Sequence, residues 1–248
     1  MRLAVIGGSG LTRLEGLERI RRVAVSTPYG EPSAPLVEGR LGDMNLIFLP
    51  RHGEGHTLPP HRVNYRANIA ALKEKGVTHI IAVAAVGGIT SQMAPQSLAV
   101  PDQIIDYTYG RDPTFFEFDD SPVTHVDLTF PYSEPLRQKL LAAGKSAGIE
   151  LFEGGCYGCT QGPRLETAAE IRRMERDGCD LVGMTGMPEA ALARELELDY
   201  ACLAVVVNWA AGKSEGIVSM AEIEAHLEAG TDKVRRVLTA FAELLSGD

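Results

Sequence analysis

The chain has 248 residues, of which 45% are hydrophobic, and its formal net charge is −9. This composition favours one α/β domain, residues 1–248, with a substantial core, and the negative charge repels the backbones of DNA and RNA. Apolar runs fall short of the roughly 18 residues of a membrane-spanning helix, and the first one ends in a glycine turn instead of a signal-peptide cleavage site. We therefore expect a cytoplasmic protein with neither a nucleic-acid nor a membrane partner.

Apolar, β-branched runs alternate with helical patterns along the whole chain. Several of these runs are apolar on both faces, which predicts a sheet that helices cover on both sides. In chain order the predicted strands are Leu3–Ile6, Asn45–Leu49, His79–Val83, Gln103–Tyr107, Leu151–Cys159, Leu181–Met184 and Cys202–Val207.

Helices are predicted between these strands from periodicity and end signals. Tyr65, Ile69 and Leu72 share one helical face, and Gly76 terminates that helix. The segment Arg111–Pro135 is rich in Pro, Asp and Phe and is predicted to be a long loop over an active site or at a subunit contact. Other helix signals are the capping boxes Thr167–Glu170 and Ser219–Glu222, the start at Pro188, and a last helix from Thr231 to about Gly247 with a stripe of Val234, Leu238, Phe241 and Leu245.

Two of the four cysteines, Cys156 and Cys159, form a CxxC pair. Such a pair is compatible with a redox centre or with half of a zinc site. A redox pair needs a helix N-terminus, whereas this segment has the pattern of a strand, and no second pair follows at zinc-ligand spacing. We favour small apolar strand residues and expect neither a metal nor a disulfide.

Two clusters near the N-terminus can bind an anion. The turn Gly7–Gly10 follows the first strand, so its backbone amides and the Ser9 hydroxyl can hold a phosphate, although such a turn is often only a turn. Arg51 and His52 end another strand and would supply a fixed cation and a hydrogen-bond donor. The histidines of this region, with His61, raise the alternative of zinc, but they lack metal-ligand spacing.

Four further clusters carry polar or small residues next to a predicted strand or helix end. Their members are Ala84 and Ala85 in a small-residue strand end, Glu166 before a capped helix, Thr185 between a strand and a helix, and Asn208 at the end of an apolar strand. Each has a structural alternative, such as tight packing or a helix cap. Because ligands bind outside the carboxyl ends of strands in such sheets, we expect the clusters to converge on one site.

These segments resemble the trimeric branch of the purine nucleoside phosphorylase and methylthioadenosine phosphorylase family. The likeness runs from Ala4 to about Leu245 and is carried by IGGSGL, PRHGEGH with VNYRANI, AAVGGI, QGPRLETAAEI and GMTGMPEA. It implies the nucleoside phosphorylase fold, in which helices flank a central mixed and partly barrel-like β-sheet. It also implies a homotrimer that needs no metal or organic cofactor and uses inorganic phosphate as a co-substrate.

The resemblance assigns roles to individual positions of this sequence. A phosphate site is implied for Ser9, Arg51, His52, Ala84, Ala85 and Thr185, where Ala84 replaces a threonine of the methylthioadenosine enzymes and leaves only a backbone contact. Nucleoside contacts are implied for Met184, at the ribose, and for Asn208, Trp209 and Ala210. His125 matches a histidine that the neighbouring subunit lends to the site.

The base pocket departs from the methylthioadenosine pattern. Those enzymes carry two aspartates where this chain has Asn208 and Ala210. Family members acting on inosine and guanosine have this Asn and pair it with a Glu at the position of Glu166. The carboxylate accepts the N1–H of a 6-oxopurine and the amide can donate to O6, whereas adenine sets a lone pair against the charge. Glu166 and Asn208 are therefore expected to stabilise the departing purine and to select 6-oxopurines.

The other end of the substrate pocket has the apolar residues of methylthio-selective enzymes. Met220 and Ile223 stand where inosine-type enzymes place a histidine for the 5′-hydroxyl, although both could be ordinary core residues. We expect phosphorolysis of a purine nucleoside with a 6-oxo base and a 5′-methylthio group. The alternatives are an inosine or guanosine phosphorylase, a methylthioadenosine phosphorylase, a nucleosidase that uses water, and a nucleoside-binding protein without activity.

Overall fold

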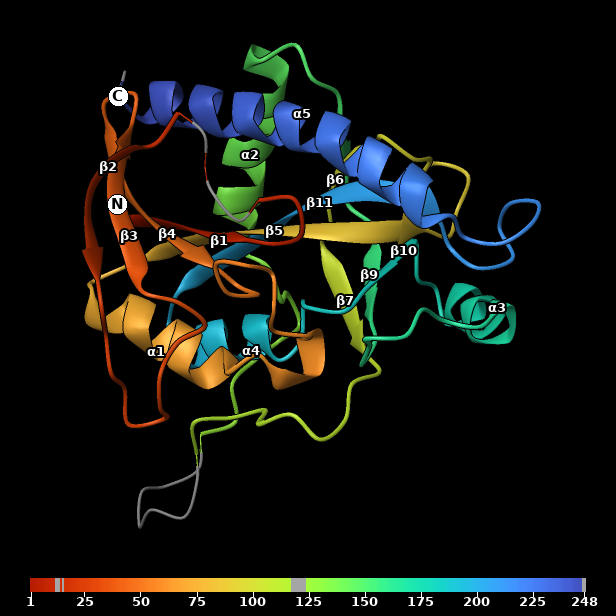
Figure 1. The fold of residues 1–248 in the computed structure, drawn as a ribbon, viewed down its shortest axis with the longest axis horizontal. Helices are drawn as coiled ribbons and strands as arrows, with labels where there is room; N and C mark the ends of the chain where they lie inside the picture. Colours follow the sequence, from red (N-terminus) through yellow and green to blue (C-terminus); the bar gives the residue numbers. More distant parts are fainter. Residues whose placement is uncertain (12–13, 15, 117–123, 247–248) are drawn as a thin grey trace.

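A mixed sheet crosses the computed structural model, which describes residues 1–11, 14, 16–116 and 124–246 (Figure 1). Within these residues the sheet has eleven strands: β1 Leu3–Gly7, β2 Glu18–Val23, β3 Leu36–Leu41, β4 Met44–Pro50, β5 His79–Gly88, β6 Leu98–Val100, β7 Gln103–Asp106, β8 Leu151–Glu153, β9 Cys156–Cys159, β10 Leu181–Gly183 and β11 Asp199–Trp209. The α-helices of the same residues are α1 Tyr65–Glu74, α2 Glu134–Ser146, α3 Ala168–Arg176, α4 Glu189–Glu195 and α5 Met220–Ser246. A short 3-10 helix, η1, spans Pro60–Arg62.

The long strand β5 is the branch point of the sheet. Its first half runs parallel between β1 and β11, and its last residues, Gly87 and Gly88, pair with the antiparallel strand β10 instead of β1. One path then runs β2-β3-β4-β1-β5-β10-β9-β7, and β11 leads from β5 to β6 and β8. This branching gives the mixed sheet its partly barrel-like form and brings the ends of β1, β5, β10 and β11 together.

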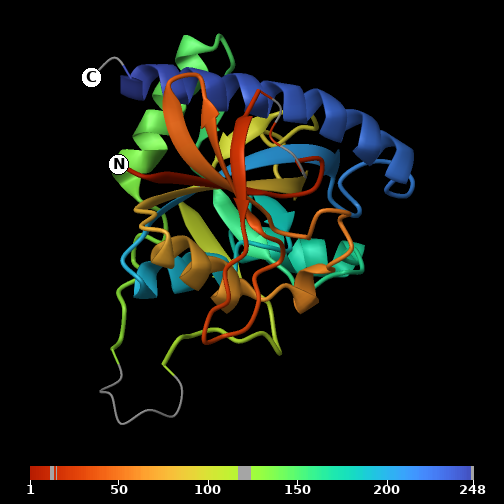
Figure 2. The same ribbon diagram turned by 60° about the vertical axis from the view of Figure 1, so that its left-hand side comes forward.

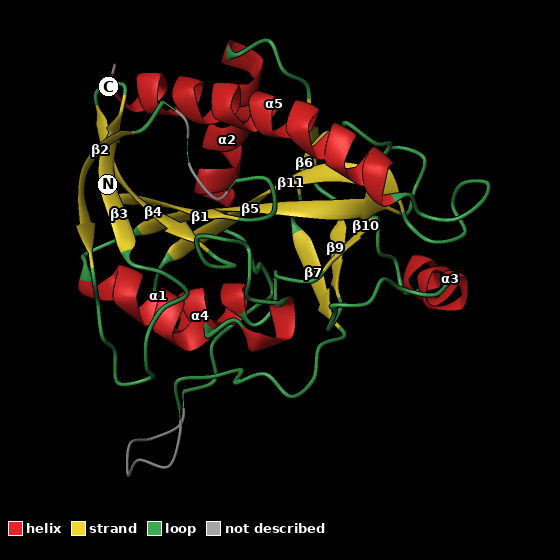
Figure 3. Ribbon diagram, viewed as in Figure 1, coloured by secondary structure: helices red, strands yellow, loops and turns green. Residues whose placement is uncertain are grey.

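Helices cover both faces of the sheet, as Figure 3 shows by element type. α2 and α5 lie on one face and α1 and α4 on the other, and the turned view of Figure 2 keeps this arrangement. The alternation of strand residues produces the two layers. On β11, Cys202 and Ala204 belong to the core cluster under α1 and α4, whereas Leu203 and Val205 belong to the cluster under α2 and α5. Two-sided burial explains why this strand is apolar throughout.

The predicted strands are present, with one correction. The single strand expected at Leu151–Cys159 is two strands, because Gly154 and Gly155 have φ values of 95° and 97°. An L-residue adopts such values at a cost, and here the backbone turns so that β8 pairs with β6 while β9 pairs with β7 and β10. β2, β3, β6 and α2 were not predicted from the sequence.

The last helix also differs from its prediction. α5 is continuous from Met220, so Thr231 lies inside it and not at its start. Ser219 Oγ accepts a hydrogen bond from the Glu222 backbone N–H at 3.4 Å, which is one half of the expected capping box. The other box, at Thr167 and Glu170, is complete. The expected end near Gly247 lies outside the described residues, among which no helix is long and apolar enough to cross a membrane.

Candidate functional site

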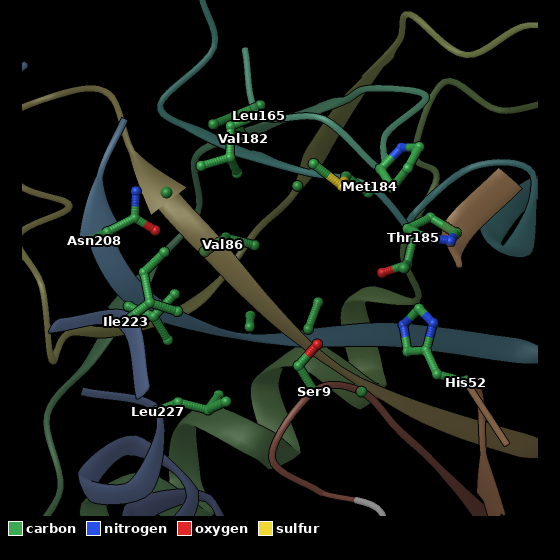
Figure 4. A pocket seen from close by; sticks show the side chains of 18 of the residues that line it. Ser9, His52, Val86, Leu165, Val182, Met184, Thr185, Asn208, Ile223 and Leu227 are labelled. Atoms are coloured by element: carbon green, nitrogen blue, oxygen red, sulfur yellow. The ribbon is translucent and has the colours of Figure 1, made fainter. Parts of the chain in front are cut away.

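One cavity of about 610 Å³ opens where the strands of the branch end (Figure 4). It lies at the carboxyl ends of β1, β4, β5, β10 and β11 and is closed by the first turns of α5. The cavity brings together most residues that the sequence singled out, namely Ser9, Arg51, His52, Ala84, Ala85, Glu166, Met184, Thr185, Asn208, Ala210, Met220 and Ile223. Residues as distant in the sequence as Ser9 and Ile223 therefore form one site.

The polar end of the cavity consists of Ser9, His52 and Thr185. Figure 4 shows His52 and Thr185 on one side and Asn208 on the other, with Ser9 between them. Close backbone packing forms this end, since a Cβ at Gly8 would lie 2.6 Å from the Val83 carbonyl oxygen. The hydroxyl groups and ring nitrogens of this end are the groups that bind an oxyanion in other proteins.

Arg51 is the buried cation behind the polar end. It is 1% exposed, and its Nε and Nη2 donate to the Glu189 carboxylate at 2.7 and 2.8 Å. Nη1 donates to the Val83 carbonyl at 2.9 Å, and Tyr200 Oη donates to Glu189 at 2.9 Å. Burial, the largest single effect, would lower the pKa of the guanidinium, but the charge of Glu189 and the hydrogen bonds to it together outweigh burial and raise that pKa. Arg51 thus stays charged, with the remaining N–H groups of Nη1 and Nη2 left for a ligand.

His52 is neutral at pH 7. Burial, and then the charge of Arg51, lowers the pKa of the imidazole to about 4. Its Nδ1 lies 2.8 Å from the Leu58 carbonyl oxygen, which can only accept, so Nδ1 carries the proton and Nε2 a lone pair. The sequence analysis expected a donor here. In the free protein the ring presents an acceptor, which suits the hydroxyl group of a protonated phosphate.

A β-bulge directs Asn208 into the cavity. Val206 pairs with Val86 and Asn208 with Gly87, so two steps along β11 match one step along β5. The extra residue, Val207, changes the alternation of side chains, and both Val207 and Asn208 reach the cavity. The Asn208 amide is oriented by a hydrogen bond from Nδ2 to the Trp209 carbonyl at 2.7 Å.

Glu166 and Asn208 form what we call the amide end of the cavity. Glu166 is half-buried in the loop between β9 and α3, and its Oε1 accepts a hydrogen bond from Thr160 Oγ1 at 2.6 Å. Ala210 also lines this part of the cavity, where its methyl group adds no charge. A carboxylate acceptor and an amide therefore face a ligand at this end, without the second carboxylate expected for a 6-aminopurine.

The apolar end of the cavity consists of Met220, Ile223 and Leu227, which lie on the first turns of α5. Spacings of three and four residues place these side chains on one face of the helix. Met220 is 61% exposed, so it is not an ordinary core residue of the helix. Ile223 and Leu227 pack partly against the core under α5, so they combine both roles.

Two predicted site residues lie outside the cavity of their own chain. Trp209 follows Asn208 on β11 and faces away, because alternate residues of a strand point to opposite sides. His125 is exposed, and no described residue of the loop 111–135 lines the cavity. The described parts of the loop, 111–116 and 124–135, therefore do not line the site of their own chain, and the expected contact of His125 with a neighbouring subunit stays a prediction.

The structure adds two residues to which the sequence patterns gave no role. His56 lines the cavity, the centre of its ring lies 4.6 Å from that of His52 in a tilted arrangement, and its Nε2 lies 3.5 Å from Ser9 Oγ. Glu189 holds Arg51 from behind the cavity. The signal for His56 was its place in the histidine-rich segment, and for Glu189 a charged residue in an otherwise apolar helix start.

The chain belongs to the phosphorylase superfamily, whose family model matches residues 2–243. Among curated relatives, the probable S-methyl-5′-thioinosine phosphorylase of Xanthomonas campestris is 56% identical over 241 residues, covering 97% of this chain and 96% of the relative. The 6-oxopurine nucleoside phosphorylase of Pyrococcus furiosus is 44% identical over 249 residues, covering 98% and 93%.

Solved structures agree with this fold. The methylthioadenosine phosphorylase of Schistosoma mansoni in complex with adenine superposes with a TM-score of 0.95 at 34% identity, covering 100% of this chain and 93% of that one. The relatives are thus named for three related purine nucleosides. The choice among them depends on the amide and apolar ends of the cavity.

Proposed function

We propose that the protein is an S-methyl-5′-thioinosine phosphorylase, an enzyme of the pentosyltransferase type. It converts methylthioinosine and phosphate to hypoxanthine and 5-methylthioribose 1-phosphate. The observation that carries the proposal is a single cavity with a polar end, an amide end and an apolar end. These three match an oxyanion, a 6-oxopurine and a thiomethyl group.

The reaction follows from this arrangement. The C1′–N9 bond lengthens and positive charge develops on the ribose, beside Met184, while a phosphate oxygen forms the new bond to C1′. Ser9, Thr185 and the free N–H groups of Arg51 hold the phosphate, and His52 Nε2 accepts a hydrogen bond from its protonated oxygen. The purine leaves with the bonding electrons and takes up a proton from water, equivalent to the one that the phosphate gives up, to become hypoxanthine. Asn208 donates to O6, and this contact strengthens as negative charge grows on the purine, while the Glu166 carboxylate accepts N1–H and orients the base.

Polar groups at the amide end favour a 6-oxopurine over adenine. The Glu166 carboxylate, an acceptor only when ionised, matches the N1–H of hypoxanthine and opposes the N1 lone pair of adenine. Names of relatives at 56% and 57% identity agree with this choice. At the apolar end, Met220 and Ile223 leave a 5′-hydroxyl without a partner, which disfavours inosine and guanosine.

The phosphate site distinguishes a phosphorylase from a nucleosidase and from a nucleoside-binding protein without activity. A nucleosidase, which uses water, would have no anion for Ser9, Thr185 and the remaining N–H groups of Arg51 to hold. A binding protein without activity would have no need of groups that pair with a growing negative charge on the base. We therefore infer that phosphate is a co-substrate and that no metal or organic cofactor takes part.

We infer further that the active form is a cytoplasmic homotrimer. His125 is exposed and does not line the cavity of its own chain, so it is available to the site of a neighbouring copy. The half-open apolar end, where Met220 is exposed, is the part that such a copy would complete. All four cysteines are free thiols, as expected in a reducing compartment.

A panel of purine nucleosides, assayed with and without phosphate, tests the proposal. We expect methylthioinosine to exceed both methylthioadenosine and inosine in kcat/KM by about tenfold to a hundredfold, since a mismatched buried polar pair costs about 1–3 kcal/mol. Asn208→Asp should shift the preference towards methylthioadenosine. Base release at an equal rate without phosphate would disprove phosphorolysis, and a wild-type preference for methylthioadenosine would disprove the assignment of the base.

A further inference from the structure

Thr160 lies directly behind Glu166, at the end of β9. It is buried, and its Oγ1 is 2.6 Å from Glu166 Oε1 and 3.3 Å from the Gly183 carbonyl oxygen. A hydroxyl has one hydrogen to donate. The carboxylate is the nearer acceptor and the charged one, and charge-assisted hydrogen bonds are the shorter and stronger kind, so the hydrogen goes to Glu166.

The backbone of Thr160 is held on both sides. Its N–H donates to the Gly183 carbonyl of β10 at 2.8 Å, and its carbonyl accepts from Arg111 Nη2 at 3.2 Å. Arg111 is itself fixed, because its Nη1 donates to Tyr65 Oη at 3.2 Å and its Nη2 to the Gln161 carbonyl at 2.8 Å. These hydrogen bonds fix the backbone of Thr160 and therefore the position from which its hydroxyl reaches Glu166.

Glu166, in contrast, lies in a wall between two cavities. Besides the main cavity it lines a second one of about 390 Å³, which contains Thr160 and the cations Arg164 and Arg173. Among the described residues, Thr160 is the one hydrogen-bond partner of the Glu166 carboxylate. Without this hydroxyl the carboxylate is free to turn towards those two arginines and away from the base.

We propose that Thr160 is a positioning residue that sets the preference for 6-oxopurines by orienting the Glu166 carboxylate at the amide end. In this orientation the carboxylate accepts the N1–H of a 6-oxopurine and opposes the N1 lone pair of adenine. This role rests on the proposed function, because it acts through the contact of Glu166 with the base.

Thr160→Val tests the role, since it removes the hydroxyl and keeps the shape and the backbone N–H. We expect kcat/KM for methylthioinosine to fall about tenfold or more, the effect of one hydrogen bond to a charged group, and that for methylthioadenosine to change less than about twofold. Thr160→Ser, which keeps the hydroxyl, should restore kcat/KM for methylthioinosine.

A double-mutant cycle with Glu166→Gln provides the matched control. If Thr160 acts through the carboxylate, Thr160→Val should change kcat/KM for methylthioinosine less than about twofold in the Glu166→Gln background. Additive losses, or equal losses for both substrates, would mean that Thr160 only packs, and would overturn the inference. No change in Thr160→Val would overturn it too. The proposed function fails separately, by a wild-type enzyme that does not prefer methylthioinosine.

Discussion

The polar end and the apolar end of the cavity are built on different parts of the fold. At the polar end, Arg51 and His52 follow β4 and Thr185 follows β10, and all three are buried in the centre of the molecule. At the apolar end, Met220 is the first residue of α5 and is mostly exposed. Groups for the proposed chemistry thus share the core of the fold, while groups for substrate choice lie at its edge.

This difference separates stability from specificity. A change at the polar end disturbs buried charges that strands, helices and ligand all share. A change on the first turn of α5 affects a surface that the remaining protein barely contacts. Mutations at the polar end should therefore mainly change the free energy of unfolding. Mutations at the apolar end should mainly change the ratio of kcat/KM between substrates.

The largest effect is expected for Glu189→Ala. It leaves the Arg51 charge buried without its carboxylate partner, which costs about 3–5 kcal/mol in the free energy of unfolding. Urea unfolding at pH 7 measures the loss. Glu18→Ala is the control, because it removes an exposed partner of Arg40 and should cost at most about 1 kcal/mol. Equal losses of unfolding free energy in the two variants would contradict the view that the polar end is part of the core of the fold.

A smaller effect concerns acid. The pKa of His52 is lowered to about 4, so between pH 6.5 and 4 the unfolded chain binds a proton that the folded chain does not, and stability falls as the pH falls. Between pH 7 and 5 this accounts for about 2 kcal/mol. His52→Asn keeps a donor for the Leu58 carbonyl and should remove that part of the slope.

Urea titrations at pH 7 and pH 5 measure the slope for the wild type and the variant. His79→Gln is the comparison variant. Burial lowers the pKa of His79 as it lowers that of His52, but the ring of His79 is less buried. A slope unchanged by His52→Asn would mean that His52 is already protonated in the folded protein. The polar end would then present a donor to phosphate, as the sequence analysis expected.

The smallest effect is expected at the apolar end. Met220→His should raise kcat/KM for inosine relative to methylthioinosine by up to about tenfold, because it gives a 5′-hydroxyl a partner. Unfolding should change by less than about 0.5 kcal/mol, as for most exposed positions. Ile217→His is the matched control: Ile217 is 91% exposed and does not line the cavity, so the substrate ratio should stay constant. An identical shift of the substrate ratio in both variants would mean that Met220 does not determine substrate choice.

Sequence patterns predicted the elements that carry strong local signals. The apolar runs of β1, β5 and β11 and the capping box of α3 are visible in a single segment, and the strand-end clusters follow from the rule that ligands bind at carboxyl ends. β2 was missed because its edge position leaves it polar, with Arg21 and Arg22 in six residues. α2 was missed because Pro135 and Pro131 suggested a loop, whereas Pro135 lies in the first turn of the helix, where proline is tolerated.

Partners that lie far apart in sequence could not be predicted in the same way. The pairing of Arg51 with Glu189 spans 138 positions, and no local pattern of either residue announces it. The neutral form of His52 depends on burial and on the position of the Leu58 carbonyl, which only the folded chain defines. The types of residue at the site could thus be predicted from the sequence, whereas their charge states and partners could not.

Gly230 separates a closely packed part of α5 from the first turns of the same helix. A Cβ at Gly230 would lie 2.2 Å from Val205 Cγ1, so helix and strand touch there, and beyond this point Val234 and Leu238 are buried. About one turn earlier in the helix, a Cβ at Gly10 would lie 2.7 Å from Leu227 Cγ. Contacts with the glycine turn and with β11 thus fix α5 at Leu227 and Gly230, whereas the helix start at Met220 is held mainly by the hydrogen bonds of the helix itself. A bulkier 5′ group can therefore displace the first turn of α5 without disturbing these contacts.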